Sequence, residues 1–393
     1  MLLLLACTGA SDDSADTSAV ALPEVLDVRQ VVPGEGLPSE ITPQASNNNL
    51  DLVVHEGRYF LAFRTGPSHF ASPDVELHVV SSDDEQTWRW EGSWAWGTDL
   101  REPRFLAWEG RLWLYFAQLG TEPTDFEPQG AWLTEYQGIG DWTDAAPLME
   151  GTDLIPWRTK VVDGVPYMLG YTGGGKIYDE SGQLEVHFLT TSDGVDWTPV
   201  DGDGVVTRGG GSETAFVLLD DGTLVAVQRN ERGDEGYEGV GGHGSKICRA
   251  EAGALNDWTC ERDPRKYDSP LMFVHDGRPF LIGRRNVTDD GHYDLGYDDM
   301  SFTAEGLAYS AEYWQTPKRC SLWEVDPESL TVDFVLDLPS AGDTCFPGLV
   351  ALSEREVLVY NYSSPIDGDL EISWVEGQHG DTNIYRQVIA WPE

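Results

Sequence analysis

Apolar and polar positions alternate along most of this chain in a unit that recurs at intervals of 53 to 58 residues. Each unit has an alternating run, a tight turn made of an acidic residue and a glycine, and a second alternating run. Asp51 to Val54 and Arg58 to Phe63 are the first example, and the turn glycines are Gly57, Gly110, Gly164, Gly222 and Gly277. Alternation with period two around such a turn predicts a β-hairpin.

A sixth unit runs from Phe346 to Leu352 and from Glu356 to Tyr360, with a turn that lacks glycine. Units of two to four strands cannot each bury a core alone, so a radial arrangement is expected. The pattern therefore predicts an all-β fold, a six-bladed β-propeller. The segment from Val25 to Val32 is expected to complete the last blade as its outer strand, which removes a free sheet edge.

The N-terminus, Leu4 to Cys7 followed by a stretch rich in Ser, Asp and Thr, is typical of a bacterial lipoprotein signal. We expect a signal over 1–7 with Cys7 as the lipidated residue, a flexible tether over 8–24, and one propeller domain over 25–393. The expected location is the bacterial outer membrane, the cell surface or the periplasm. Four leucines without a preceding Lys or Arg make an incomplete match, so a misplaced start or a chance motif is the alternative.

Four further cysteines, Cys248, Cys260, Cys320 and Cys345, allow three pairings. Cys248 and Cys260 flank a predicted outer hairpin and are expected to face each other across it. Cys320 with Cys345 then joins the fifth unit to the sixth. Disulfides imply an oxidising compartment, whereas four buried thiols are the alternative.

The formal charge of −43 is spread along the chain. Such a field repels nucleic acid and anionic membranes, so we expect no nucleic-acid partner and membrane contact only through the lipid anchor. The protein is expected to be a monomer. No His, Cys or Asp spacing reaches a metal motif, and the run from Gly239 to Gly244 lacks the context of a phosphate loop, so neither a metal nor another cofactor is expected.

Ser81 to Trp88 resembles the Asp-box of sialidases, Ser-x-Asp-x-Gly-x-Thr-Trp, and Thr191 to Trp197 is similar to it. This is a structural motif, in which the Asp holds the turn and the Trp packs between blades. Glu213 to Asn230 resembles the sialidase segment in which a Glu assists a tyrosine nucleophile and an Arg binds the substrate carboxylate. A hairpin brings Glu213 and Arg229, 16 residues apart, to the same face. A surface ion pair is the alternative.

The same geometry, applied to all six units, selects residues at one rim of the propeller. Arginine is frequent there, and guanidinium groups bind carboxylate or sulfate through paired hydrogen bonds. The predicted substrate-binding residues are Arg64, Arg104, Arg158, Arg229, Arg285, Glu102 and Asp51. Gln118, Tyr171 and Arg284 map to the same rim.

The chain departs from the sialidase pattern at two positions. Asn47 to Asp51 stands where the family has its first triad arginine, and Phe346 stands where it has the nucleophilic tyrosine. Tyr360 or Tyr362 is the remaining tyrosine candidate. Asp74 occupies the loop that holds the family's acid/base Asp, and His69 in that loop is the alternative acid/base. His187 is expected to pack, and His243 to line the site.

The insertion from Asn286 to Arg319 is long enough to be a lid or a binding loop. Its aromatic residues suit stacking on sugar rings or, alternatively, a small core of the loop itself. They are Tyr293, Tyr297, Tyr309, Tyr313 and Trp314.

The expected function is sialidase-like hydrolysis of an anionic glycan, a sialic acid, uronic acid or sulfated sugar, by exo-acting cleavage. Glu213 and Asp74 are the preferred carboxylates, with Glu102 and Asp51 as reserves. A carbohydrate-binding or adhesion propeller without catalysis is the main alternative, and a polysaccharide lyase is the third possibility.

Overall fold

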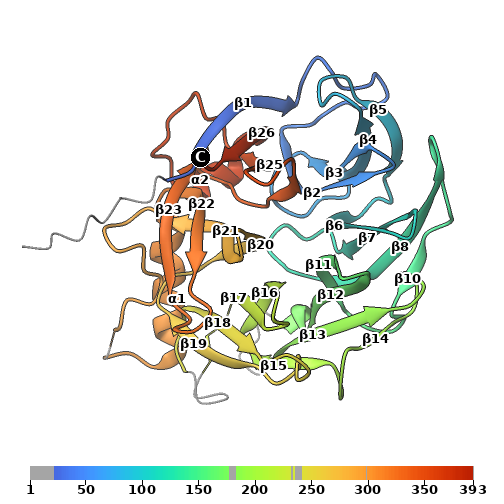
Figure 1. Ribbon diagram of the computed structural model, residues 1–393. Coiled ribbons are helices and arrows are strands. Elements are labelled where there is room, and N and C mark those ends of the chain that lie inside the picture. Colours follow the sequence, from blue (N-terminus) through green and yellow to red (C-terminus); the bar gives the residue numbers. More distant parts are fainter. Residues whose placement is uncertain (1–21, 177–182, 232, 235–240, 298, 393) are drawn as a thin grey trace, which may run out of the picture.

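A computed structural model describes residues 22–176, 183–231, 233–234, 241–297 and 299–392. Six antiparallel sheets surround one axis, as Figure 1 shows. The protein is therefore a six-bladed β-propeller, as the repeat predicts. Among the described residues, no helix is long and apolar enough to cross a membrane.

Each blade begins at the axis and ends at the periphery, with the strands of one blade following one another in the sequence. Blade 1 contains β2 (Ser46–His55), β3 (Arg58–Gly66), β4 (Glu76–Ser82) and β5 (Arg89–Trp94). Blade 2 contains β6 (Asp99–Trp108), β7 (Arg111–Leu119), β8 (Pro128–Gly138), β9 (Asp141–Trp142) and β10 (Ala146–Leu148). Blade 3 contains β11 (Ile155–Val162), β12 (Val165–Thr172), β13 (Leu184–Thr191), β14 (Trp197–Pro199) and β15 (Val205–Gly209).

Blades 4 to 6 follow the same order. Blade 4 contains β16 (Gly211–Leu218), β17 (Leu224–Asn230), β18 (Ser245–Ala250) and β19 (Thr259–Asp263). Blade 5 contains β20 (Asp268–His275), β21 (Arg278–Asn286), β22 (Lys318–Val325) and β23 (Val332–Leu338). Blade 6 contains β24 (Gly348–Ala351), β25 (Glu356–Ser363), β26 (Asn383–Ala390) and, at its outer edge, β1 (Glu24–Val32).

The pairing of β1 with β26 joins the two ends of the described chain in one sheet. Val25 lies opposite Ile389, and Val32 lies opposite Ile384. The predicted outer strand over Val25 to Val32 is confirmed. The ring is therefore closed by strands from both ends of the described chain. β1 covers the outer edge of β26, which would otherwise be unpaired.

The acidic-Gly turns have the backbone that their sequence predicts. Glu56 and Gly57 have φ values of 49° and 77°, and Asp276 and Gly277 have 50° and 72°. Positive φ at both central residues matches the right-handed twist of the flanking strands. The turn after β16 differs, because it spans more residues and Gly222 alone of its acidic-Gly pair has positive φ.

Two polar turns at the outer side of blades 1 and 3 are held by aspartate. Asp84 accepts hydrogen bonds from the backbone N–H groups of Gln86 and Thr87, and Asp193 accepts them from residues 195 and 196. The tryptophan after each turn packs against a neighbouring blade. Trp88 lies 6.1 Å from the ring of Tyr360, and Trp197 lies 5.8 Å from the ring of Tyr115. The cores between blades thus include these tryptophans.

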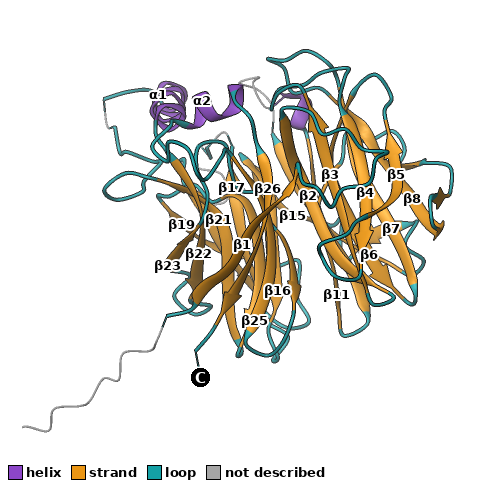
Figure 2. Ribbon diagram, turned by 90° about the horizontal axis from the view of Figure 1, so that it is seen from above, coloured by secondary structure: helices purple, strands orange, loops and turns teal. Residues whose placement is uncertain are grey.

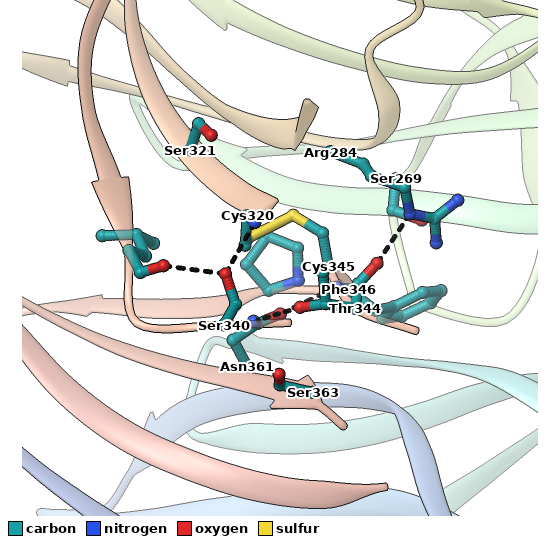
Figure 3. Close-up of a disulfide and its surroundings, with 12 residues drawn as sticks. Ser269, Arg284, Cys320, Ser321, Ser340, Thr344, Cys345, Phe346, Asn361 and Ser363 are labelled. Atoms are coloured by element: carbon teal, nitrogen blue, oxygen red, sulfur yellow. Dashed lines mark hydrogen bonds between the residues drawn. A yellow bond between two sulfur atoms is a disulfide. The ribbon is translucent and has the colours of Figure 1, made fainter. Parts of the chain in front are cut away.

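Both predicted disulfides are present. Cys248 and Cys260 occupy opposed positions on β18 and β19, and Cys320 on β22 is bonded to Cys345, just before β24. The first bridge lies within one blade, whereas the second joins blades 5 and 6. Figure 3 shows the second bridge beside Thr344 and Phe346. Two disulfides are compatible with an exported protein.

The insertion in blade 5 forms α1 (Phe302–Gln315), and α2 (Trp374–His379) lies between β25 and β26. Figure 2 shows both helices at one end of the sheets, together with the short helix η1 (Gly174–Lys176). We call this end the upper face. Tyr293, Tyr309 and Tyr313 pack with Trp374 as a small core, while Trp314 is exposed. The insertion's tyrosines thus form its own core, as the alternative interpretation holds.

Candidate functional site

Five of the six inner strands carry a β-bulge near the upper face. The register of β2, β6, β11, β16 and β20 shifts there against the second strand of each blade. The residues inside these shifts are Asn49, Glu102 and Pro103, Trp157, Ser212 and Glu213, and Ser269 and Pro270. Asn49, Glu102 and Ser269 have φ values of 43°, 53° and 52°. Bulges re-aim side chains and are frequent beside active sites.

The bulged residues of neighbouring blades contact one another around the axis. Asn49 Nδ2 donates to Glu102 Oε1 at 2.9 Å, and the backbone N–H of Ser269 donates to Glu213 Oε2 at 2.7 Å. Across the axis, Trp157 of blade 3 packs edge-on against Phe346, which precedes β24 of blade 6, with ring centroids 5.2 Å apart. The bulges thus place two glutamates, Glu102 and Glu213, at the centre of the upper face.

Arg229, on β17, is surrounded by carboxylates. Its guanidinium group forms ion pairs with Glu213, Glu231 and Asp268, the last at 2.9 Å. Glu213 and Arg229 therefore share one site, as their spacing predicts. The Arg229 side chain is 17% exposed, so one edge of it remains accessible from the upper face.

Asp268 connects this group to blade 5 and to α1. Arg284 Nη1 donates to Asp268 Oδ2 at 3.1 Å, and the hydroxyl of Tyr313 donates to the same oxygen at 2.9 Å. Arg284 Nε also donates to the carbonyl of Thr344 at 2.6 Å, which Figure 3 shows beside the Cys320–Cys345 disulfide. The disulfide thus lies next to the loop that holds Arg284.

Asp343, in the loop before β24, accepts hydrogen bonds from three side chains. The Tyr362 hydroxyl donates at 3.0 Å, Trp374 Nε1 donates at 3.1 Å, and His69 Nδ1 lies 2.7 Å from the second carboxylate oxygen. Arg284 Nη2 donates to the Tyr362 hydroxyl at 3.4 Å. A continuous polar chain therefore runs across blades 1, 6, 5 and 4. We call Glu213, Arg229, Asp268, Arg284, Asp343 and Tyr362 the central cluster.

The charges of the central cluster stabilise one another. Although burial opposes ionisation, Arg229 and the other neighbouring cations lower the pKa of Asp268 to about 2. Burial likewise opposes the charge of Arg229, but Asp268 and Glu213 raise the pKa of Arg229 well above its usual value. Asp343 also has a lowered pKa, because His69 and Arg284 outweigh its burial. Within the cluster, Arg229, Asp268 and Asp343 are therefore held in their charged forms by their neighbours.

Glu102 has the opposite environment. Burial raises the pKa of Glu102 to about 7, against the attraction of Arg104 and with a further contribution from the negative charge of Glu213. Glu102 is thus largely protonated in weakly acidic solution, while Glu213 beside it has a guanidinium partner. Two carboxyl groups in different environments are the arrangement that acid/base catalysis requires.

Arg104, Arg158 and Asp51 lie deeper than the sequence predicts. They follow the bulges along the inner strands. Arg104 and Arg158 are almost fully buried and Asp51 is half-buried, and Arg158 Nε donates to the carbonyl of Pro270 at 2.9 Å. Arg64 is also buried, and it pairs with Asp99 at 2.8 Å. These arginines do not form one exposed basin with Arg229, because position along the strand sets depth below the face.

Arg285, Tyr360 and Asp74 lie outside the central cluster. Arg285 pairs with Asp337 on β23 at 2.6 Å, because successive residues of β21 point to opposite sides and Arg284 takes the inner one. The Tyr360 hydroxyl donates to Glu85 in the interface between blades 6 and 1. Asp74 is exposed on the surface, and its backbone N–H is bound by the Ser72 hydroxyl.

Two histidines are packed. His243 stacks on Phe302 of α1, with centroids 4.1 Å apart, so it supports the helix and does not line the site. His187 hydrogen-bonds the Thr172 hydroxyl at 2.9 Å within blade 3, as expected for a packing residue. The run over 239–244 lies partly outside the described residues, and Cys7 lies wholly outside them.

Two surface hollows lie away from the axis. One, of about 210 Å³, is lined by Arg58, Asp84 and Trp88, and the other, of about 470 Å³, lies along blade 2 between Gln129 and Asp153. Neither contains a member of the central cluster. The side chains of the central cluster are instead paired with one another.

The sequence analysis missed several residues of this site. Asp343 lies in a loop and Trp374 in α2, neither of which has a repeat signal, and Asn49 belongs to the stretch that stands where the first triad arginine was expected. The one available signal was position, because Asp343 immediately precedes the predicted opening of the last inner strand. Tyr362 was a considered alternative to Tyr360, and its hydroxyl does reach the cluster.

No family model matches this chain, and no curated protein matches it. Solved structures do. A protein of unknown function from Dyadobacter fermentans has a TM-score of 0.58 at 15% identity, over 88% of this chain and 95% of that one. The sialidase of Trypanosoma rangeli in complex with sialic acid gives 0.57 at 10% identity, over 88% of this chain and 54% of the sialidase.

The endosialidase of phage phi92 has a TM-score of 0.58 at 10% identity, over 93% of this chain and 69% of that chain. The chain thus spans about half the length of the trypanosomal sialidase. Identities this low show the fold alone. The protein has a six-bladed β-propeller fold similar to that of these sialidases.

Proposed function

We propose that the protein is a glycoside hydrolase that cleaves an anionic glycan, with Glu102 as general acid and Glu213 as general base. The observation that carries the proposal is the pair of bulged glutamates at the centre of the upper face. Burial raises the pKa of Glu102 to about 7, and Glu213 is paired with Arg229. Glycosidases need one protonated and one ionised carboxyl group on either side of the scissile bond.

The reaction requires only these groups and water. The carboxylic acid of Glu102 gives its proton to the glycosidic oxygen, which leaves with the electron pair of the broken C–O bond. Water attacks the anomeric carbon, and its proton passes to Glu213. Phe346 stands where sialidases carry their nucleophilic tyrosine, and the Tyr362 hydroxyl is buried and bonded to Asp343. We therefore expect single-step displacement with inversion at the anomeric carbon.

The accessible edges of Arg229 and Arg101 are the proposed contacts for a carboxylate or sulfate of the substrate. Their side chains are 17% and 12% exposed and lie on the upper face. The complex of the trypanosomal sialidase with sialic acid supports an acidic sugar as the ligand of this fold. Charge and paired hydrogen bonds favour arginine for such groups.

The test is a panel of sialosides, uronides, sulfated glycans and neutral glycans, with products analysed by mass spectrometry and NMR. Hydrolysis adds water, a lyase leaves an unsaturated product, and a binding protein leaves the glycan intact. Glu102→Gln and Glu213→Gln should each lower kcat by a factor of about 10² or more while binding persists. Wild-type turnover in both variants, or cleavage of neutral glycans alone, contradicts the proposal.

A carbohydrate-binding propeller without catalysis is the second candidate. One observation favours it: Arg229 and Arg284 already have carboxylate partners, so their charge is compensated before any ligand binds. In that case Arg229→Lys weakens glycan binding, and no member of the panel is cleaved.

We also propose that residues 1–23, which precede β1, form a lipoprotein signal and tether, and that the protein is exported as a monomer. The two disulfides support export. Detergent-phase partitioning of the full chain, compared with Cys7→Ser, tests the anchor. Equal partitioning of both forms into the aqueous phase contradicts it.

A further inference from the structure

Two arginines lie close together near the axis of the propeller, below the central cluster. Arg158, on β11, reaches the carbonyls of Pro270 and Pro347, which belong to blades 5 and 6. Arg104, on β6, donates to the carbonyls of Leu50 and Pro103. Figure 1 shows the inner strands that surround this axis. We call Arg104, Arg158 and Lys160 the channel cations.

The two guanidinium groups share the same aromatic walls. Arg104 lies 4.4 Å from the centroid of Phe346 and 4.8 Å from that of Trp157. Arg158 lies 5.9 Å and 5.5 Å from the same two rings. Both groups therefore border one region near the axis, which these two rings line.

That region has unused hydrogen-bond donors. Arg104 Nε, Arg104 Nη2, Arg158 Nη2 and Trp157 Nε1 are buried, and none has a hydrogen-bond partner among the described residues. The nearest carboxylate oxygen to Arg104 Nη2 that forms an ion pair, Glu102 Oε2, is 3.9 Å away, too long for a hydrogen bond. Burial of unpaired donors is costly. All four are N–H groups, so each can donate a hydrogen bond to an acceptor placed between them.

The carboxylates of Asp51, Glu102 and Glu213 act on both Arg104 and Arg158, but among the described contacts neither arginine donates a hydrogen bond to any of them. Lys160 Nζ donates to the carbonyls of Phe216 and Met272, and burial, together with the neighbouring Arg158, lowers the pKa of Lys160 to about 7. Asp51 accepts from the backbone N–H of Phe105. Burial, together with the neighbouring Arg104, lowers the pKa of Arg158 well below its usual value. The channel cations thus repel one another.

We propose that this region binds a small inorganic anion of the halide class, chloride under physiological conditions. An anion can accept hydrogen bonds from these donors and weakens the mutual repulsion of Arg104 and Arg158, whereas water supplies no charge. Arg104 and Arg158 are 1% and 4% exposed, which excludes a sugar as the occupant. The site does not depend on the proposed hydrolase activity.

Bromide provides the direct test. Crystals of the full chain, soaked in sodium bromide, should show an anomalous peak within about 3.5 Å of Arg158 Nη2 and Arg104 Nε. A peak absent from this region, or peaks confined to the outer surface, overturns the proposal. This measurement uses the unmodified protein, so it does not depend on whether a variant folds.

Thermal unfolding provides a second test. At constant ionic strength, replacing gluconate by chloride should raise Tm by a few degrees in a saturable manner. The rise should disappear in Arg158→Met and persist in Arg285→Met, whose arginine pairs with Asp337 on the outer part of blade 5. A chloride response that is linear, or equal in both variants and the wild type, also overturns the proposal.

Discussion

Two sets of buried arginines lie on the axis of this propeller, and their charges are compensated differently. Arg229 and Arg284, near the upper face, contact carboxylates directly. Burial opposes the charge of both, but neighbouring groups raise both pKa values. Asp268 contributes most for Arg229, and Tyr362 with Asp268 for Arg284. Arg104 and Arg158, further along the inner strands, donate mainly to carbonyls, and burial lowers the pKa of both.

The difference shows that burial alone does not define the role of an arginine. A guanidinium with well-placed carboxylates is part of a compensated network, and removal of one partner leaves an unpaired buried charge. A guanidinium with carbonyl partners keeps its charge available for an anion. The upper set is thus suited to hold Glu213 in place, and the deeper set to hold a small ion.

The largest effect is expected for Asp268→Asn. Asp268 is fully buried and receives hydrogen bonds from Arg284 and Tyr313, so the substitution should lower the free energy of unfolding by about 3–5 kcal/mol. Denaturant unfolding measures this. The matched control is Asp337→Asn, which removes a partly exposed partner of Arg285 and should cost less than about 1 kcal/mol. Equal losses would remove the distinction between buried and surface pairs.

The pH dependence of Asp268 follows from its lowered pKa. The folded protein releases this proton near pH 2, whereas an unfolded Asp releases it near its ordinary value of 3.8. The stabilisation is therefore complete above about pH 4 and is lost as the pH falls through about 2. Asp268→Asn should unfold with a weaker acid dependence than the wild type between pH 4 and pH 2.

The two disulfides are expected to separate stability from activity. Each should contribute about 2–4 kcal/mol, so the paired Cys→Ser variants should lose comparable stability. Cys345 adjoins Thr344, whose carbonyl binds Arg284, whereas Cys248 and Cys260 lie on the outer strands of blade 4. Loss of the Cys320–Cys345 bridge should therefore also reduce kcat. Equal kcat values in the two paired variants would contradict this.

Glu102→Gln is expected to change the alkaline side of the stability profile. Folded Glu102 keeps its proton up to about pH 7, and its ordinary value is 4.5. Because the folded state binds more protons, the free energy of unfolding falls as pH rises from about 4.5 to about 7, by up to about 3 kcal/mol. Glu102→Gln should remove that fall, which unfolding curves at pH 5 and pH 8 measure. An unchanged difference would mean that Glu102 is ionised throughout.

The smallest effect is expected for Arg158→Met. In chloride-free buffer the variant loses hydrogen bonds to two carbonyls but also an uncompensated charge, so stability should change by only about 1–2 kcal/mol. Arg229→Met, which removes the guanidinium group that three carboxylates share, is the contrasting variant. If Arg158→Met costs as much as Arg229→Met in this buffer, the deeper arginines are compensated after all.

Local chemistry made the blades and the disulfides predictable. Acidic-Gly turns, alternation and cysteines placed across a hairpin each act over a few residues, and the 16-residue spacing was enough to bring Glu213 to Arg229. The site was less predictable, because its contacts join loops that are far apart in the chain. Asp343 meets His69 across 274 residues of sequence.

The bulges explain the remaining errors. They insert residues near the start of five inner strands, so a count along a regular hairpin does not give the direction or the depth of a side chain. Arg104 and Arg158 follow their bulges and are buried, and Arg284 points inward where Arg285 was expected. Glu102 and Ser269 have positive φ at their bulges, but neither is glycine, the residue that would have indicated such a backbone in the sequence.

The repeated bulge also bears on how such a surface can change during evolution or in the laboratory. At positions 49, 102, 157, 213 and 269 the backbone of the inner strand sets the direction of the residue. The sheets behind them are held by their own ladders and cores. Five positions from five different blades thus form a compact set for a combinatorial library, in which new specificities can be selected without redesign of the scaffold.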